Sequence, residues 1–180
     1  MSGQTISVRD LCLIATGAAL LAVCSWLSIP FTVPFTLQSF AVCLLAALLG
    51  LRRGVLAVLI YMLLGAAGLP VFSGFRAGLG VLLGATGGYL LGFLLTALAV
   101  GFAADRFPGH ARSLALAMLI GMLLCYACGT AWFLLVYTRG SGAMGLLGAL
   151  NLCVFPFLLP DALKCALALG LALRLRRHIR

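Results

Sequence analysis

The sequence has very few charged residues, and most of them are arginines. Charged side chains make up 8% of the 180 residues, only 3 residues are acidic, and Lys164 is the single lysine. Soluble domains carry charge at roughly a quarter of their positions. This scarcity, with a mean hydropathy of +1.25, excludes an ordinary soluble domain and indicates an integral membrane protein.

The sequence also lacks the motifs of common enzymes. It contains no G-x-x-x-x-G-K-[ST], so the chain cannot itself bind and hydrolyse ATP in the usual way. It contains no HExxH, no carboxylate dyad and no nucleophile beside a positioned histidine, and both histidines, His110 and His178, lie in polar segments. We therefore expect a protein that is not an enzyme.

The cysteines give no sign of a metal or redox centre. Cys125 and Cys128 form a CxxC, but no second CxxC or paired histidine follows. The 7 cysteines lie mostly within apolar runs, where we interpret them as small buried hydrophobes. We predict neither a metal site nor a cofactor. The net charge of +9 does not indicate nucleic-acid binding, because the basic residues lie at the ends of apolar runs.

The apolar runs predict an all-α integral membrane protein with a single membrane domain over residues 1–180. At ~20 residues a span, the chain has room for about six transmembrane helices and short loops. The N-terminus lacks a convincing cleavage site, so its apolar run is expected to be a retained first helix. The expected spans cover residues 11–29, 37–51, 54–68, 80–104, 113–137 and 160–176.

The segment from 139 to 174 is too long for one span, since as a helix it would reach ~50 Å across a ~30 Å core. We expect a short extra helix over residues 141–152 before the sixth span. A break should follow at Phe155-Pro156 and Leu159-Pro160.

The arginines predict the orientation. With six spans both termini lie on one side, and that side collects nine basic residues, whereas the other has two. The positive-inside rule then places both termini in the cytoplasm. The first group is Arg9, Arg52, Arg53, Arg106, Arg112, Arg174, Arg176, Arg177 and Arg180; the second is Arg76 and Arg139.

Asp161 and Lys164 are the strongest candidates for a ligand site. They stand three residues apart, on one face of the sixth span. Ionisable groups at membrane depth are costly and often functional. The alternative is an internal ion pair that holds the start of the helix, and the two roles can overlap.

A second candidate region is the segment from Gly68 to Gly92, whose turn carries Arg76. Its glycines at 80, 84, 88 and 92 would share one helix face, which favours close helix packing over ligand contact. Phe31, Phe35, Phe72, Phe75 and Tyr89 are candidates for an apolar wall, and Gln38, Thr86, Gly88, Tyr89 and Asn151 complete the candidate contacts.

Three stretches resemble one family. VPFTLQSF (33–40), GLPVFSGFRAGLGVLLGATGGYLLGF (68–93) and PFLLPDALK (156–164) are similar to the BioY proteins, the biotin-specific S components of energy-coupling factor (ECF) transporters. Two departures are visible: the family's Gly-Pro-Thr-Gly-Gly-Tyr has alanine at 85, and its Pro-Gly-Asp reads Leu-Pro-Asp at 159–161.

The resemblance implies a six-helix protein that captures biotin from the outer side, in the lipid bilayer, with a transmembrane coupling protein and cytoplasmic ATPases as partners. It implies that Asp161 accepts from the ureido ring, assisted by Asn151 or Gln38, and that Lys164 or Arg76 pairs with the carboxylate. It also implies docking of the coupling protein on small residues of the first helix, either Ala15 with Ala19 or Ala18 with Ala22. The alternatives are an S component for another vitamin, such as thiamine or riboflavin, and a membrane scaffold or small channel.

Overall fold

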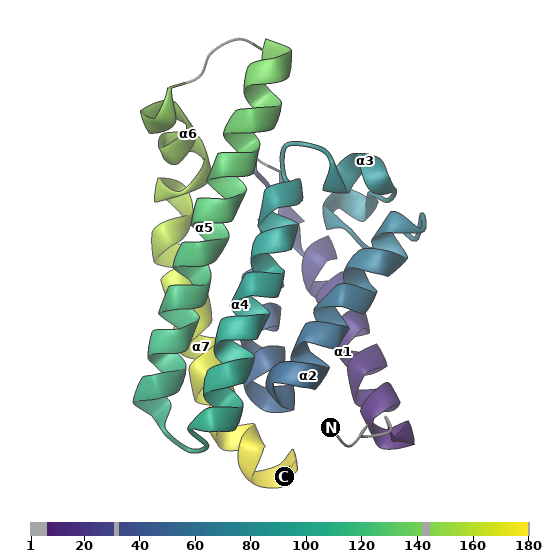
Figure 1. Cartoon of the computed structure of the whole chain (residues 1–180), viewed down its shortest axis with the longest axis vertical. Coiled ribbons are helices and arrows are strands. Elements are labelled where there is room, and N and C mark those ends of the chain that lie inside the picture. The colour runs from purple at the N-terminus through teal and green to yellow at the C-terminus, as the bar shows by residue number, and fades with distance from the viewer. Residues whose placement is uncertain (1–6, 31–32, 142–144, 180) are drawn as a thin grey trace, which may run out of the picture.

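The computed structural model describes residues 7–30, 33–141 and 145–179, and these residues form a helical bundle (Figure 1). Short strands β1 and β2 pair antiparallel between the first two helices. In chain order the elements are α1 Val8–Trp26, β1 Ser28–Ile29, β2 Phe35–Thr36, α2 Gln38–Ala66, the 3-10 turn η1 Ser73–Phe75, α3 Leu79–Leu82, α4 Gly87–Arg106, α5 Ala111–Ser141, α6 Leu146–Cys153 and α7 Phe155–Ile179.

Within the described residues, 5 helices are long and apolar enough to cross a membrane: α1, α2, α4, α5 and α7. All-helical architecture is therefore confirmed. The start of α1 and the end of α7 lie at the same end of the bundle, and α3 and α6 lie at the other end (Figure 1).

Helix α2 is folded back on itself at Gly50, so it forms a hairpin with two arms. Gly50 has φ 79° and ψ −172°, which is not helical. The amide of Gln38 donates a 2.7 Å hydrogen bond to the hydroxyl of Tyr61, although residues so far apart would be separated by about 34 Å in a straight helix. The arms match the two predicted segments 37–51 and 54–68, and the 5 candidate spans count this hairpin once.

The turn of this hairpin rests on the end of α4. The backbone N–H of Leu51 donates a 2.8 Å hydrogen bond to the carboxylate of Asp105. A Cβ on Gly101 would lie 2.6 Å from the Cα of Leu51, so glycine there permits the close approach. Asp105 thus satisfies a free N–H at the start of the second arm, as a capping side chain does.

The glycine track from 80 to 92 is not on one helix, which corrects the predicted span 80–104. The chain makes one turn at α3, leaves the helix at 83–86 and enters α4 at Gly87. Only the later glycines pack against α5: a Cβ on Gly92 would lie 2.8 Å from the Cα of Cys125. Glycine weakens a helix interior, and here it permits a break.

The last third of the chain also differs in its boundaries. The short helix is α6, Leu146–Cys153, and residues 142–144 of the segment predicted as 141–152 lie outside the described residues. Helix α7 begins at Phe155 instead of 160 and continues through Pro160. Phe157 stacks on Phe35 and Asp161 bonds to Ser39, so α7 is held on both sides of the proline.

Candidate ligand-binding site

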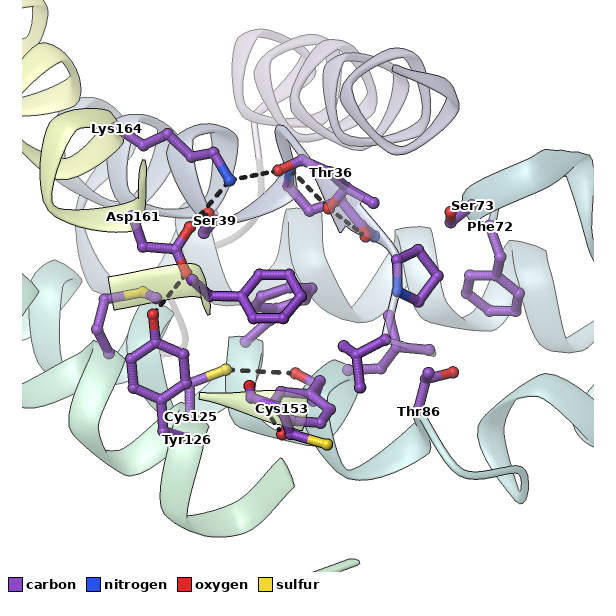
Figure 2. Close-up of a pocket in the computed structure, with 18 of the residues that line it drawn as sticks. Thr36, Ser39, Phe72, Ser73, Thr86, Cys125, Tyr126, Cys153, Asp161 and Lys164 are labelled. Carbon is purple, nitrogen blue, oxygen red and sulfur yellow. Dashed lines mark hydrogen bonds and ion pairs between the residues drawn. The ribbon is translucent and has the colours of Figure 1, made fainter. Parts of the chain in front are cut away.

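A cavity lies among the starts of α2, α4 and α7, the middle of α5 and the segment between α2 and α4 (Figure 2). The space that it encloses, with the open mouth included, is about 690 Å³. Its wall is mostly apolar, with polar groups at separate places. The lining residues are Val33, Pro34, Thr36, Gln38, Ser39, Phe72, Ser73, Arg76, Val81, Thr86, Tyr89, Leu90, Phe93, Met122, Cys125, Tyr126, Cys153, Phe157, Asp161 and Lys164.

The carboxylate of Asp161 is the centre of a hydrogen-bonded cluster at one end. Oδ1 accepts from the hydroxyl of Ser39 at 2.8 Å and from Nζ of Lys164 at 2.9 Å. Oδ2 accepts from the hydroxyl of Tyr126 at 2.6 Å. A carboxylate has about four acceptor positions, so Asp161 can accept one further N–H from a ligand.

Lys164 is held from three directions. Besides Asp161, its Nζ donates a 2.7 Å hydrogen bond to the carbonyl of Thr36 and lies 3.8 Å from the centre of the Phe35 ring. Its side chain is 8% exposed and that of Asp161 is 10% exposed. The ion pair that the sequence analysis held as the alternative is therefore formed. A buried pair of this kind is stable only with such additional bonds.

Gln38 contributes through a second network behind the charged cluster. Its Oε1 accepts a 3.0 Å hydrogen bond from the hydroxyl of Thr36, while its amide donates to Tyr61. Its backbone N–H in turn donates to the Thr36 hydroxyl at 3.2 Å. The network fixes Thr36, whose carbonyl receives the bond from Lys164.

The other end of the cavity is formed by the segment after α2. Phe72 is 1% exposed, meets Tyr61 edge to face at 5.6 Å and packs on Gly65. Ser73 follows it, and its carbonyl accepts a 3.2 Å hydrogen bond from Nε of the exposed Arg76. Figure 2 shows Phe72, Ser73 and Thr86 facing the end that holds Asp161, Lys164 and Tyr126.

The cavity therefore offers an acceptor and a donor at its inner end, an apolar middle and an arginine at its mouth. Tyr89, in the middle, has its hydroxyl 3.3 Å from that of Thr130 and donates to the carbonyl of Cys153 at 3.4 Å. Such a site suits an elongated ligand that is polar at both ends.

The structure brings most of the predicted site residues together. Seven of them line the cavity: Gln38, Phe72, Arg76, Thr86, Tyr89, Asp161 and Lys164. Gly88 and Asn151 do not line it. A Cβ on Gly88 would lie 2.2 Å from that of Trp132, and Asn151 lines a separate groove beside Phe35 and Pro156.

Sequence reasoning did not single out four polar lining residues, Thr36, Ser39, Ser73 and Tyr126. Ser73 lies within the stretch 68–93. Thr36 and Ser39 lie within the stretch 33–40, so that motif was the available signal. No local pattern marks Tyr126. Of the aromatic residues proposed for the wall, Phe75 stacks on Trp26 and is 63% exposed, and Phe31 lies outside the described residues.

The two candidate docking pairs on α1 differ in exposure. Ala15 and Ala19 are exposed on the outer face of α1. Ala18 and Ala22 are 3% and 6% exposed and belong to the core. A partner can reach only the first pair without moving α1.

Comparisons with known proteins agree on one family. The BioY family model matches residues 1–180. A protein of Thermotoga maritima named biotin transporter BioY is 42% identical over 160 residues, which cover 88% of this chain and 90% of that protein. Biotin transporter BioY2 of Lactococcus lactis subsp. cremoris is 38% identical over 173 residues, 94% of this chain and 92% of that protein.

The fold matches a solved structure as well. The crystal structure at 2.1 Å of the S-component for biotin from an ECF-type ABC transporter superposes with a TM-score of 0.84. The match has 26% sequence identity and covers 95% of this chain and 92% of that one. The helical arrangement in Figure 1 is thus that of an S component.

Proposed function

The chain belongs to the BioY family, and on this premise we propose that it is the biotin-binding S component of an ECF-type uptake transporter, with the cavity as its biotin site. The buried Asp161–Lys164 pair at the end of an apolar cavity carries this proposal. The named relatives and the structural neighbour support biotin as the ligand.

The chemistry of biotin fits the order of groups along the cavity. The ureido ring has two N–H donors and a carbonyl acceptor, and it lies at the inner end. One N–H donates to Asp161, and Lys164 or Tyr126 lies beside the ureido carbonyl. The thiophane ring and valeryl chain occupy the apolar middle, where Tyr89 and Phe157 line the wall.

The carboxylate of biotin then lies at the mouth, beside Arg76. Two features favour Arg76 over Lys164 as its partner. Lys164 is already neutralised by Asp161, whose negative charge would repel a second carboxylate. Arg76 forms no ion pair with any residue that the structure describes, and it is exposed on the cavity wall.

Calorimetric titration of the purified protein tests the ligand and its orientation together. Biotin should bind, and excess thiamine or riboflavin should not compete. Asp161→Asn should weaken biotin and its uncharged amide, biotinamide, to a similar extent. Arg76→Gln should weaken biotin by about tenfold and leave biotinamide nearly unchanged.

Three results would contradict this. Absence of biotin binding, or competition by another vitamin, would contradict the assignment of biotin as the ligand. If Lys164→Gln selectively weakens biotin whereas Arg76→Gln weakens both ligands or neither, the orientation is reversed.

The membrane arrangement follows from the same proposal. The two arms of α2 and the helices α1, α4, α5 and α7 cross the bacterial inner or plasma membrane as six spans. Arg52, Arg106, Arg112 and Arg174 belong to segments at the end of the bundle where α1 begins, and by the positive-inside rule this supports a cytoplasmic location for that end, with the cavity mouth outside. A transmembrane coupling protein docks on Ala15 and Ala19, and cytoplasmic ATPases supply the energy.

A further inference from the structure

Both tryptophans of the chain hold the same segment. The sequence contains 2 tryptophans. The indole N–H of Trp26, at the end of α1, donates a 2.8 Å hydrogen bond to the carbonyl of Pro70. The indole N–H of Trp132, on α5, donates a 2.9 Å hydrogen bond to the carbonyl of Gly84. The two acceptors lie near opposite ends of residues 69–86, the mouth segment.

The mouth segment forms one side of the cavity but has little regular structure of its own. Its only elements are η1 and α3, of 3 and 4 residues. Gly74 and Gly78 have positive φ values of 69° and 91°. Nevertheless it supplies Phe72, Ser73, Arg76, Val81 and Thr86 to the cavity wall. Its internal bonds are local, such as the 3.1 Å bond from the N–H of Phe72 to the carbonyl of Arg76, so its position against the bundle depends on contacts with other elements.

Trp26 also contacts the mouth segment at the residue with its most unusual backbone conformation. Phe75 has φ 57° and is the single non-glycine with positive φ among the described residues. An aromatic residue rarely adopts this conformation. Its ring stacks on Trp26 with 5.1 Å between centroids and 25° between planes. Arg76 is the next residue, so the stack fixes the backbone that presents Arg76 to the mouth.

The Trp132 contact explains the glycine at 88. Because a Cβ on Gly88 would lie 2.2 Å from that of Trp132, only glycine leaves room for the tryptophan at this point of α4. Trp132 therefore reaches the carbonyl of Gly84, two residues before Thr86 on the cavity wall. Gly88 acts on the cavity through Trp132 and not as a wall residue.

We propose that Trp26 and Trp132 are positioning residues that clamp the mouth segment at its two ends. Trp26 fixes the part that carries Ser73 and Arg76, and Trp132 fixes the part that carries Thr86. Neither indole lines the cavity. The consequence for ligand retention rests on the proposed function, whereas the clamp itself does not.

Trp26→Phe and Trp132→Phe test the clamp, because each removes an N–H donor and keeps an apolar ring. In ligand-free protein, amide hydrogen exchange should become about 3- to 10-fold faster in residues 72–78 for Trp26→Phe and in residues 83–86 for Trp132→Phe, as expected for one lost hydrogen bond. Exchange in α2 and α4 should not change. Biotin should dissociate faster by a similar factor.

Phe102→Leu is the control, because Phe102 is an exposed aromatic residue of α4, remote from the mouth segment. It should leave exchange and dissociation unchanged. Unchanged exchange in the mouth segment of both tryptophan variants overturns the clamp, as does an equal increase in every helix. If the wild-type protein binds no biotin, the proposed function fails, but the exchange measurements still decide the clamp.

Discussion

The hydroxyl of Tyr126 lies 2.6 Å from Oδ2 of Asp161 and donates a hydrogen bond to it. This bond joins α5 to α7 inside the cavity, and the bond from Ser39 joins α2 to the same carboxylate at 2.8 Å. Three helices that are distant in sequence therefore meet at one acidic side chain. The orientation of Asp161 depends on all three.

Replacing Tyr126 by phenylalanine should weaken biotin binding by about 10- to 100-fold. The change removes a hydrogen bond to a charged group, worth ~1.5–3 kcal/mol, and frees Oδ2 to turn from the ligand. Calorimetry measures the affinity. Tyr89→Phe is the matched control: the Tyr89 hydroxyl bonds only to neutral partners, at 3.3 and 3.4 Å, and its removal should cost less. Equal losses in the two variants would contradict the role assigned to Tyr126.

Removal of either member of the Asp161–Lys164 pair should destabilise the protein more than removal of both. Asp161→Asn or Lys164→Met leaves one buried charge without its partner, at a cost of ~3–5 kcal/mol. The double variant leaves no charge and should recover part of that loss. Thermal unfolding in detergent, without ligand, gives the comparison. Additive losses in the double variant would show that the two charges are not coupled.

Asp105→Ala should lower stability by ~1–2 kcal/mol, because the N–H of Leu51 loses its capping carboxylate. Asp105→Asn keeps an acceptor and should lose less. Biotin affinity should not change, since Asp105 lies at the end of α4 remote from the cavity. Thermal unfolding and calorimetry check the two parts. A loss of affinity without a loss of stability would be inconsistent with a capping role.

Composition and short-range spacing were sufficient to predict much of this structure. Long apolar runs predicted the helices at 11–29 and 113–137, and Arg52-Arg53 marked the turn between the α2 arms. The i, i+3 spacing of Asp161 and Lys164 placed both on one helix face, which made the ion pair one of the two roles considered for them.

The glycine spacing at 80–92 could not reveal the break before α4. Regular spacing is compatible with a helix but does not require one. The carbonyl of Leu82 lies so close to Gly87 that no side chain fits there, and this contact arises only in the folded turn. The contacts of Trp132 with Gly84 and with Gly88 also arise only in the tertiary structure.

The hydrogen-bond partners of Asp161 could not be predicted from the sequence for a similar reason. Ser39 and Tyr126 are separated from it by 122 and 35 residues. Neither local propensity nor periodicity specifies which helices become neighbours. The motif at 33–40 indicated that this stretch matters, but not that Ser39 bonds to α7.

The last prediction concerns the exposed alanine pair on α1, Ala15 and Ala19. Ala19→Trp should abolish biotin uptake by cells that contain the coupling protein and ATPases, because a large side chain prevents close helix approach. Biotin binding by the purified variant should stay unchanged, since Ala19 faces away from the core. Ala166→Trp on α7, another exposed alanine, is the control and should retain uptake. Ala18→Trp should instead destabilise the fold, because Ala18 is 3% exposed. Normal uptake by Ala19→Trp would remove this face of α1 from the docking surface.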